Sequence, residues 1–172
     1  MAARAEHKAG TALVLIPGSV NFFNNIAGQR LVEALRRLGW DVKLTSLQTY
    51  AGERADLAFL VSLYELFFAC ESPAQARANL KTLRRNCPRV MMWLLEPVHT
   101  PWFHNSFSLF LECGLDTLTD NALHDQRDEL PEEHRGYYHH LFYGLTEAEK
   151  QQVRSLDFED ELRSIPWVFV GY

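Results

Sequence analysis

The stretch that decides the fold is LAFLV, residues 57–61, because it is apolar at every position. A strand with one face in water alternates apolar and polar residues, whereas an unbroken apolar run needs cover on both of its faces. Two more runs of this kind lie at 12–16 and 90–95. Such strands are typical of a parallel sheet between two layers of helices.

Helical patterns separate these runs. The sequence Ser72-Pro73-Ala74-Gln75 combines an N-cap, a proline at the first helical position and a glutamine three residues after the cap, which predicts a helix over 73–86. Leucines spaced by three or four residues predict another helix over 28–38. The predicted fold is therefore α/β, a Rossmann-like three-layer sandwich with a mostly parallel sheet and with strand 12–16 in its middle. Further strands are predicted at 42–47 and 115–118.

The remaining segments have a weaker periodicity. Residues 19–28 and 99–106, which contain Asn or His among aromatic side chains, are predicted as loops. Residues 107–113 and the aromatic run 137–143 are each predicted as a helix ended by glycine, and a capping box predicts a helix from 146.

Three parts of the chain are expected from composition. Residues 1–10 are polar and small, as in a flexible leader, and residues 11–156 form the Rossmann-like domain. Residues 157–172 are a charged linker followed by an apolar strand, which we expect to be the first strand of a second domain that is missing or docked. We expect this strand to leave Trp167 and Phe169 exposed.

Composition argues against several classes of protein. The 172 residues carry a net charge of −5, whereas binding to a nucleic-acid backbone needs a surplus of Lys and Arg. No signal peptide is apparent, and the longest apolar stretch, 57–70, is too short to span a bilayer. Three widely spaced cysteines favour a reducing compartment and no zinc site, so we expect a cytoplasmic protein without a metal.

The residues that follow each strand are the candidates for a site, because ligands of open parallel sheets bind outside the carboxyl ends of the strands. The loop after the first strand lacks the G-x-G-x-x-G pattern, so a tightly bound dinucleotide is not expected. The candidate catalytic residues are Glu96 and His99. The candidate substrate-binding residues are Ser19, Asn21, Asn24, His104 and Asp120.

Each candidate has a structural alternative. Glu96 beside Trp93 is either a general base with a raised pKa or the cap of a nearby helix. His99 and His104 next to aromatic residues suit sugar or base stacking with proton transfer, or else have a structural role. The asparagines of the first loop bind hydroxyls or anions, or stabilise turns.

Four features together resemble a known family: the strand, loop and helix over 12–39, the sequence Ala55-Asp56-Leu57 before the third strand, the strand and acidic residue at 90–96, and the closing sequence RSIPWVFVG at 163–171. Together they resemble the N-terminal domain of GT-B glycosyltransferases, in particular the CgeB-like spore-maturation branch. The resemblance implies a two-domain enzyme whose first half binds a sugar or glycan acceptor and often supplies the base. Its second half, a C-terminal domain or subunit, would bind the nucleotide-sugar donor.

The chain departs from this family because it stops at Tyr172, where the donor-binding domain would begin. We therefore expect the acceptor-binding half of a glycosyltransferase, inactive alone and without a cofactor of its own. Two alternatives stay open. One is a stand-alone Rossmann-like module that binds a small molecule. The other is a protein-interaction subunit that uses the aromatic run 137–143.

Overall fold

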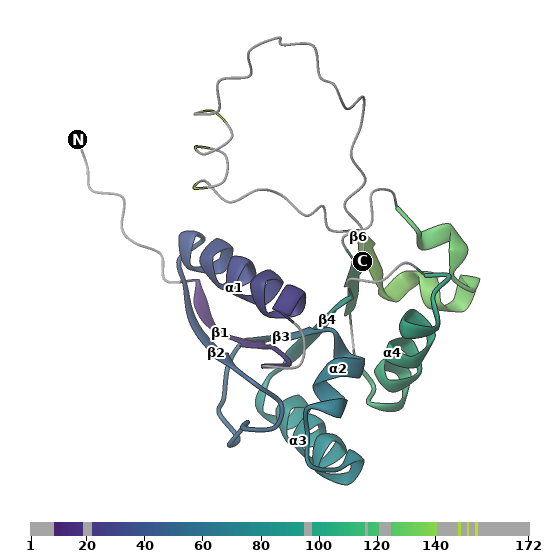
Figure 1. Ribbon diagram of the computed structural model, residues 1–172, viewed down its shortest axis with the longest axis horizontal. Helices are drawn as coiled ribbons and strands as arrows, with labels where there is room; N and C mark the ends of the chain where they lie inside the picture. The colour runs from purple at the N-terminus through teal and green to yellow at the C-terminus, as the bar shows by residue number, and fades with distance from the viewer. Residues whose placement is uncertain are drawn as a thin grey trace, which may run out of the picture.

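Six parallel strands form one sheet in the order β2-β1-β3-β4-β5-β6 (Figure 1). The computed structural model describes residues 9–18, 22–94, 98–115, 117–120 and 125–140, with the single positions 148, 151 and 154. The all-parallel sheet with helices confirms the predicted α/β Rossmann-like class. The strands are β1 (Gly10–Leu15), β2 (Trp40–Thr45), β3 (Leu57–Val61), β4 (Arg89–Leu94), β5 (Thr117–Asp120) and β6 (Tyr138–His140).

Helices cover the two faces of the sheet unequally. Figure 1 shows α1 on one side of the sheet and α3 on the other. Along β1, Ala12 and Val14 pack in the core beneath α1, whereas Leu13 and Leu15 belong to the larger core under the other helices. All five residues of β3 are buried, as its unbroken apolar run predicts. The helices are α1 (Phe22–Arg37), α2 (Leu63–Phe68), α3 (Pro73–Asn86) and α4 (Pro101–Glu112), with 3-10 turns η1 (Arg127–Glu129) and η2 (Glu132–Tyr137).

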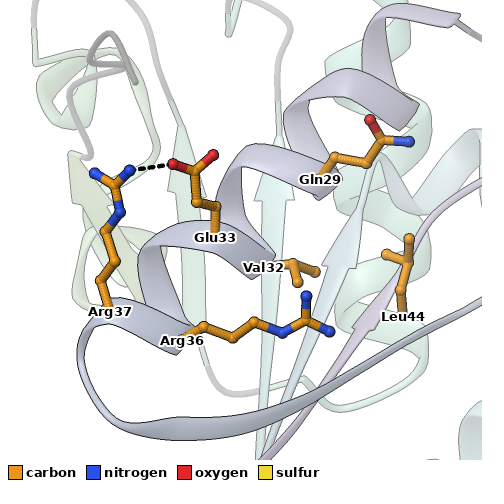
Figure 2. Close-up of a pocket in the computed structure, with 6 residues that line it drawn as sticks. All are labelled: Gln29, Val32, Glu33, Arg36, Arg37 and Leu44. Carbon is orange, nitrogen blue, oxygen red and sulfur yellow. Dashed lines mark hydrogen bonds and ion pairs between the residues drawn. The ribbon is translucent and has the colours of Figure 1, made fainter. Parts of the chain in front are cut away.

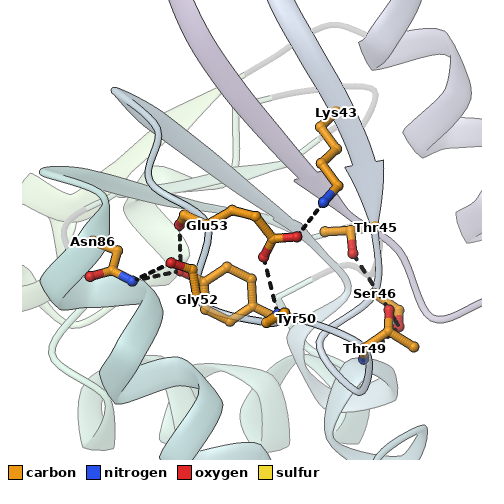
Figure 3. A network of polar contacts seen from close by, with 9 residues as sticks. Lys43, Thr45, Ser46, Thr49, Tyr50, Gly52, Glu53 and Asn86 are labelled. Atoms are coloured by element: carbon orange, nitrogen blue, oxygen red, sulfur yellow. Dashed lines mark hydrogen bonds and ion pairs between the residues drawn. The ribbon is translucent and has the colours of Figure 1, made fainter.

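The connection from β2 to β3 has no helix and is held by side chains instead (Figure 3). The Asn86 side chain of α3 donates to the Gly52 carbonyl at 2.8 Å and to the Tyr50 hydroxyl at 3.3 Å. That hydroxyl donates to the Glu53 carbonyl at 2.7 Å, and the Glu53 carboxylate pairs with Lys43. This network fixes the connection against α3, where its apolar residues join the larger core.

Three predicted local structures are wrong. Helix α1 begins at Phe22, so the predicted loop 19–28 is incorrect from that residue onward. Helix α4 begins at Pro101, inside the predicted loop 99–106, because Thr100 accepts a capping bond from the Phe103 N–H at 3.2 Å. The predicted helix 137–143 is incorrect at Tyr138–His140, which pair with β5 as strand β6. Helix α2 had no counterpart in the prediction.

Helix α1 approaches the end of β1 closely at Gly28. A Cβ built on Gly28 would lie 2.2 Å from Cγ2 of Ile16. Alanine is usually better than glycine in a helix by about 1 kcal/mol, but forcing a methyl group into a filled space costs about 1–3 kcal/mol. We expect Gly28→Ala to lower the free energy of unfolding by about 1 kcal/mol in urea titrations. Gly136→Ala is the control, because nothing surrounds a Cβ there; a more stable Gly28→Ala variant would contradict the close packing.

Asp56 ties the start of β3 to β1. Its Oδ2 accepts from the Thr11 N–H at 2.8 Å and from the Thr11 hydroxyl at 3.0 Å. These bonds lower the pKa of Asp56, the backbone bond most. A lowered folded-state pKa gives stability that is present above the unfolded value of about 3.9 and is lost as pH falls through the folded value.

We therefore expect Asp56→Asn to be less stable than the unsubstituted chain at pH 7. We also expect the variant to lose less additional stability as the pH falls below about 4. Urea unfolding at both pH values measures this, with Asp128→Asn as a control at a side chain that is 94% exposed. Parallel pH profiles of Asp56→Asn and the unsubstituted chain would contradict the assigned role of the carboxylate.

Candidate functional site

The topology places one candidate site at the carboxyl edge, defined here as the edge where all six parallel strands end. The chain passes from β1 to β2 on one side of β1 and then continues with β3 on the other side. The order β2-β1-β3-β4-β5 is that of flavodoxin-like doubly wound sheets, which bind ligands where this reversal occurs. The part of the carboxyl edge beside β1 and β3 is therefore the candidate functional site.

Ser62, directly after β3, has a strained backbone at this point. Its φ of 55° and ψ of 82° are left-handed, and it is the one non-glycine residue with positive φ among those that the structure describes. Its N–H donates to the Trp93 carbonyl at 2.9 Å, and its carbonyl accepts from the Leu66 N–H at 3.1 Å. Such strain costs about 1–3 kcal/mol and is concentrated at functional sites.

The first turn of α1 is joined to α2 across the same reversal. The Asn24 amide donates to Oε2 of Glu65 at 2.7 Å, and the Asn24 side chain is buried. Asn24 therefore lies at the predicted edge. Its side-chain amide is already hydrogen-bonded to Glu65, so we assign Asn24 to the wall of the candidate site. Beside it, the buried Oδ1 of Asn25 accepts no hydrogen bond from the residues that the structure describes. Buried acceptors nearly always have a hydrogen-bond partner, so this oxygen is a candidate contact for a small polar molecule.

The segment that leads into α4 and the first turn of that helix contribute the two predicted histidines. His99 follows β4 and is exposed, and His104 is exposed one turn into α4. The His104 ring lies edge-on to Phe103, with 5.7 Å between the centroids. Both residues come after the carboxyl end of β4, so the topology brings them to the same edge as Ser62.

Other predicted site residues are placed only in part. Asp120 is the last residue of β5, and so its backbone is at the carboxyl edge. Ser19, Asn21 and Glu96 lie outside the described residues, although the strands that precede them, β1 and β4, both end at this edge. The predicted exposure of Trp167 and Phe169 also concerns residues outside the described part of the chain.

A buried polar link supports the far side of this edge and was missed by sequence reasoning. Oε1 of Gln126 accepts from the Val98 N–H at 2.9 Å. The Gln126 N–H donates to the Tyr138 hydroxyl at 3.1 Å, and both side chains are buried. The segments that follow β4 and β5 are thereby held together through β6. Glutamine in a polar segment gave no sign of this burial.

A concavity lies away from the carboxyl edge, between α1 and the edge strand β2, and has a volume of about 600 Å³ (Figure 2). Arg36 donates to the carbonyl of Val42 at 3.1 Å, and Arg37 pairs with Glu33 on the same helix. A strand at the edge of a sheet needs protection from pairing with other chains. We interpret this concavity as a protected sheet edge and not as a ligand site, because the charged side chains that line it already pair with the backbone or with each other.

The cysteines do not have the surroundings of activated nucleophiles. Burial raises the pKa of the Cys70, Cys87 and Cys113 thiols, and a reactive cysteine needs a lowered one. Within the described ranges, no group of three or more His, Cys, Asp or Glu side chains could hold a metal ion. Among the helices of those ranges, none combines the length and the apolar character needed to cross a membrane.

Comparison of the chain with protein-family models, with curated proteins and with solved structures finds no match in any of the three.

Proposed function

We propose that this domain binds a small, hydroxyl-bearing molecule at the carboxyl edge beside β1 and β3. The observation that carries the proposal is the reversal of strand order at β1 and β3, with the strained Ser62 at the end of β3. Open α/β sheets bind ligands at such a reversal, and backbone strain there holds a wall in a fixed position.

The chemistry of the described edge favours hydroxyl groups over phosphates. The segments 16–18, 22–26, 62–66 and 98–104 contain no Lys or Arg. They offer the Asn25 acceptor, the imidazoles of His99 and His104, and the Glu65 carboxylate. Phosphate sites use arginine, lysine or glycine-rich backbone loops, whereas neutral hydroxyls are bound by amides, imidazoles and carboxylates.

A narrower form of the proposal is the acceptor-binding half of a sugar-nucleotide-dependent glycosyltransferase. It is supported by the resemblance to GT-B enzymes and by the lack of cationic residues in the four segments named above. In that arrangement the nucleotide-sugar donor is bound by a separate domain or subunit. An encoding frame that continues past Tyr172 into a second βα pattern would favour this form, and a stop codon would favour a stand-alone binding module.

Titrations followed by ¹⁵N NMR test the proposal. Methyl β-D-glucopyranoside is expected to shift the amide resonances of Asn24, Asn25, Ser62 and His99, and His99→Ala is expected to weaken this binding. UDP-glucose is expected to leave these resonances unchanged, because the described edge has no group for its pyrophosphate. Shifts caused by UDP-glucose at this edge would contradict the acceptor-side assignment, and no shift with the glucoside would contradict the proposed site.

A further inference from the structure

Three helices on the opposite side of the sheet from α1 surround a pocket of about 330 Å³. We name it the aromatic pocket and define it by Tyr64, Phe67, Phe68, Arg77, Asn105 and Ser108. These residues come from α2, α3 and α4. Phe68, Asn105 and Ser108 are exposed, and Tyr64 lies three residues after the end of β3.

Two rings of the aromatic pocket, Tyr64 and Phe68, form a row with Trp102, which contacts Tyr64 but does not line the pocket. Phe68 is 66% exposed and lies edge-on to Tyr64, with 4.6 Å between the centroids. Tyr64 in turn lies 5.4 Å from Trp102, which is 56% exposed. Exposed aromatic rings at a concave surface are typical of binding sites, because they bring a large contact area at a small entropic cost.

Free neutral polar groups surround these rings. The Tyr64 hydroxyl and the side chains of Asn105 and Ser108 make no hydrogen bond with any residue that the structure describes. Asn105 and Ser108 are both exposed on α4, three residues apart and therefore on one face of the helix. Together with the Tyr64 hydroxyl, these two side chains offer an amide and two hydroxyls beside the apolar rings.

The charge of Arg77 is already balanced. Its Nη2 donates to Oε2 of Glu112 at 3.1 Å, its Nε pairs with Oε1, and its guanidinium lies 5.7 Å from the centre of the Phe67 ring. The hydrogen bond to Glu112 raises the pKa of Arg77, and the same bond lowers the pKa of Glu112. The pair stays ionised and neutral as a whole, so the pocket favours an uncharged ligand.

We propose that the aromatic pocket binds one ring of a neutral sugar. The C–H face of a pyranose packs on aromatic rings, while its hydroxyls bond to Asn105, Ser108 and the Tyr64 hydroxyl. The volume is at the lower end of small-molecule sites, about 300–1,000 Å³, and suits one or two sugar rings. An extended peptide of six residues would need a groove about 19 Å long. This site adjoins the one proposed at the carboxyl edge, because Tyr64 lies in the segment 62–66 of that edge. Its proposed contacts do not include Asn25 or His99, so the two proposals can fail independently.

Saturation-transfer NMR with the 172-residue chain tests the proposal, using methyl β-D-glucopyranoside and cellobiose as probes. We expect saturation transfer to the sugar ring protons and amide shifts at Tyr64, Phe68, Asn105 and Ser108. Phe68→Ala and Asn105→Ala are each expected to weaken binding roughly five- to tenfold. The matched control is Leu111→Ala, which removes an apolar side chain of α4 that is 41% exposed and outside the pocket.

Each other outcome overturns the proposal. No saturation transfer to either sugar, or transfer that Phe68→Ala leaves unchanged, would exclude this pocket as a sugar site. Phe68-dependent binding of adenosine or of a proline-rich peptide that is tighter than that of cellobiose would assign the pocket to a different ligand class. Sugar binding that His99→Ala abolishes and Phe68→Ala does not would place the sugar at the carboxyl edge alone, which distinguishes the two proposals.

Discussion

Tyr138→Ala is expected to lower the free energy of unfolding by about 3–5 kcal/mol, the usual cost of removing a large buried aromatic side chain. Tyr138 is 1% exposed and is among the largest fully buried side chains. Its loss leaves a cavity in the larger core and also removes the acceptor of the Gln126 N–H. Urea unfolding followed by circular dichroism measures the change.

Tyr137→Ala is the matched control for this prediction. Tyr137 is the preceding residue, is 37% exposed, and touches the core through an edge-on contact with Phe110 at 5.5 Å. We expect it to cost about 1 kcal/mol. The contrast follows from their positions, because Tyr137 is the last residue of η2 whereas Tyr138 begins β6 and is buried by its pairing with β5. Equal costs for the two substitutions would argue against β6.

Strand β6 shows why part of the fold could not be predicted from the sequence. Three residues, Tyr138–His140, are too few to reveal a period of two, and their aromatic neighbours fit a helix equally well. The strand exists because it pairs with β5 and buries Tyr138, which are long-range contacts. In contrast, β3 and β4 could be predicted, because a strand that is buried on both faces has a continuous run of apolar residues.

The missed start of α4 has a different cause, because its signal was present in the sequence. Thr100-Pro101 is the same combination of cap and first-turn proline as Ser72-Pro73, which correctly predicted α3. His99 and His104, on either side of Thr100, were interpreted as loop residues, although Phe103, Phe107 and Phe110 form a helical apolar stripe. A systematic search for caps would have placed this helix and with it His104.

The candidate site could be predicted as an edge but not as a set of contacts. Parallel topology alone brings Asn24, His99 and Asp120 to the carboxyl ends of the strands. The bond between Asn24 and Glu65 joins residues 41 positions apart, and nothing in either local sequence indicates it. The left-handed backbone of Ser62 is equally hidden, because serine has no preference for positive φ.

Substitution of Ser62 is the second change for which we expect a large effect on stability. Ser62→Val is expected to lower the free energy of unfolding by roughly 3 kcal/mol. A β-branched side chain at positive φ costs about 1–2 kcal/mol or more, and its extra bulk at a buried position costs about 1–3 kcal/mol. Ser62→Ala keeps the strain without adding bulk and is expected to remain within about 1 kcal/mol of the unsubstituted chain.

Substitution by glycine measures the cost of the left-handed backbone at Ser62. A second serine of equal burial, Ser106, serves as the comparison. Ser62 and Ser106 are both 1% exposed, but Ser106 lies in the regular helix α4 and accepts a bond from the Tyr64 N–H at 3.3 Å. Ser106→Gly is expected to cost about 1 kcal/mol or more, since glycine weakens a helix and the bond is lost. Ser62→Gly is expected to raise the free energy of unfolding by up to about 1 kcal/mol, because glycine adopts positive φ without strain. If the strain holds the wall of the carboxyl edge in place, Ser62→Gly will also bind methyl β-D-glucopyranoside more weakly despite its greater stability. Urea titrations of both variants measure the sign of each change in the free energy of unfolding. Equal destabilisation by the two substitutions would show that Ser62 is not strained in the folded chain.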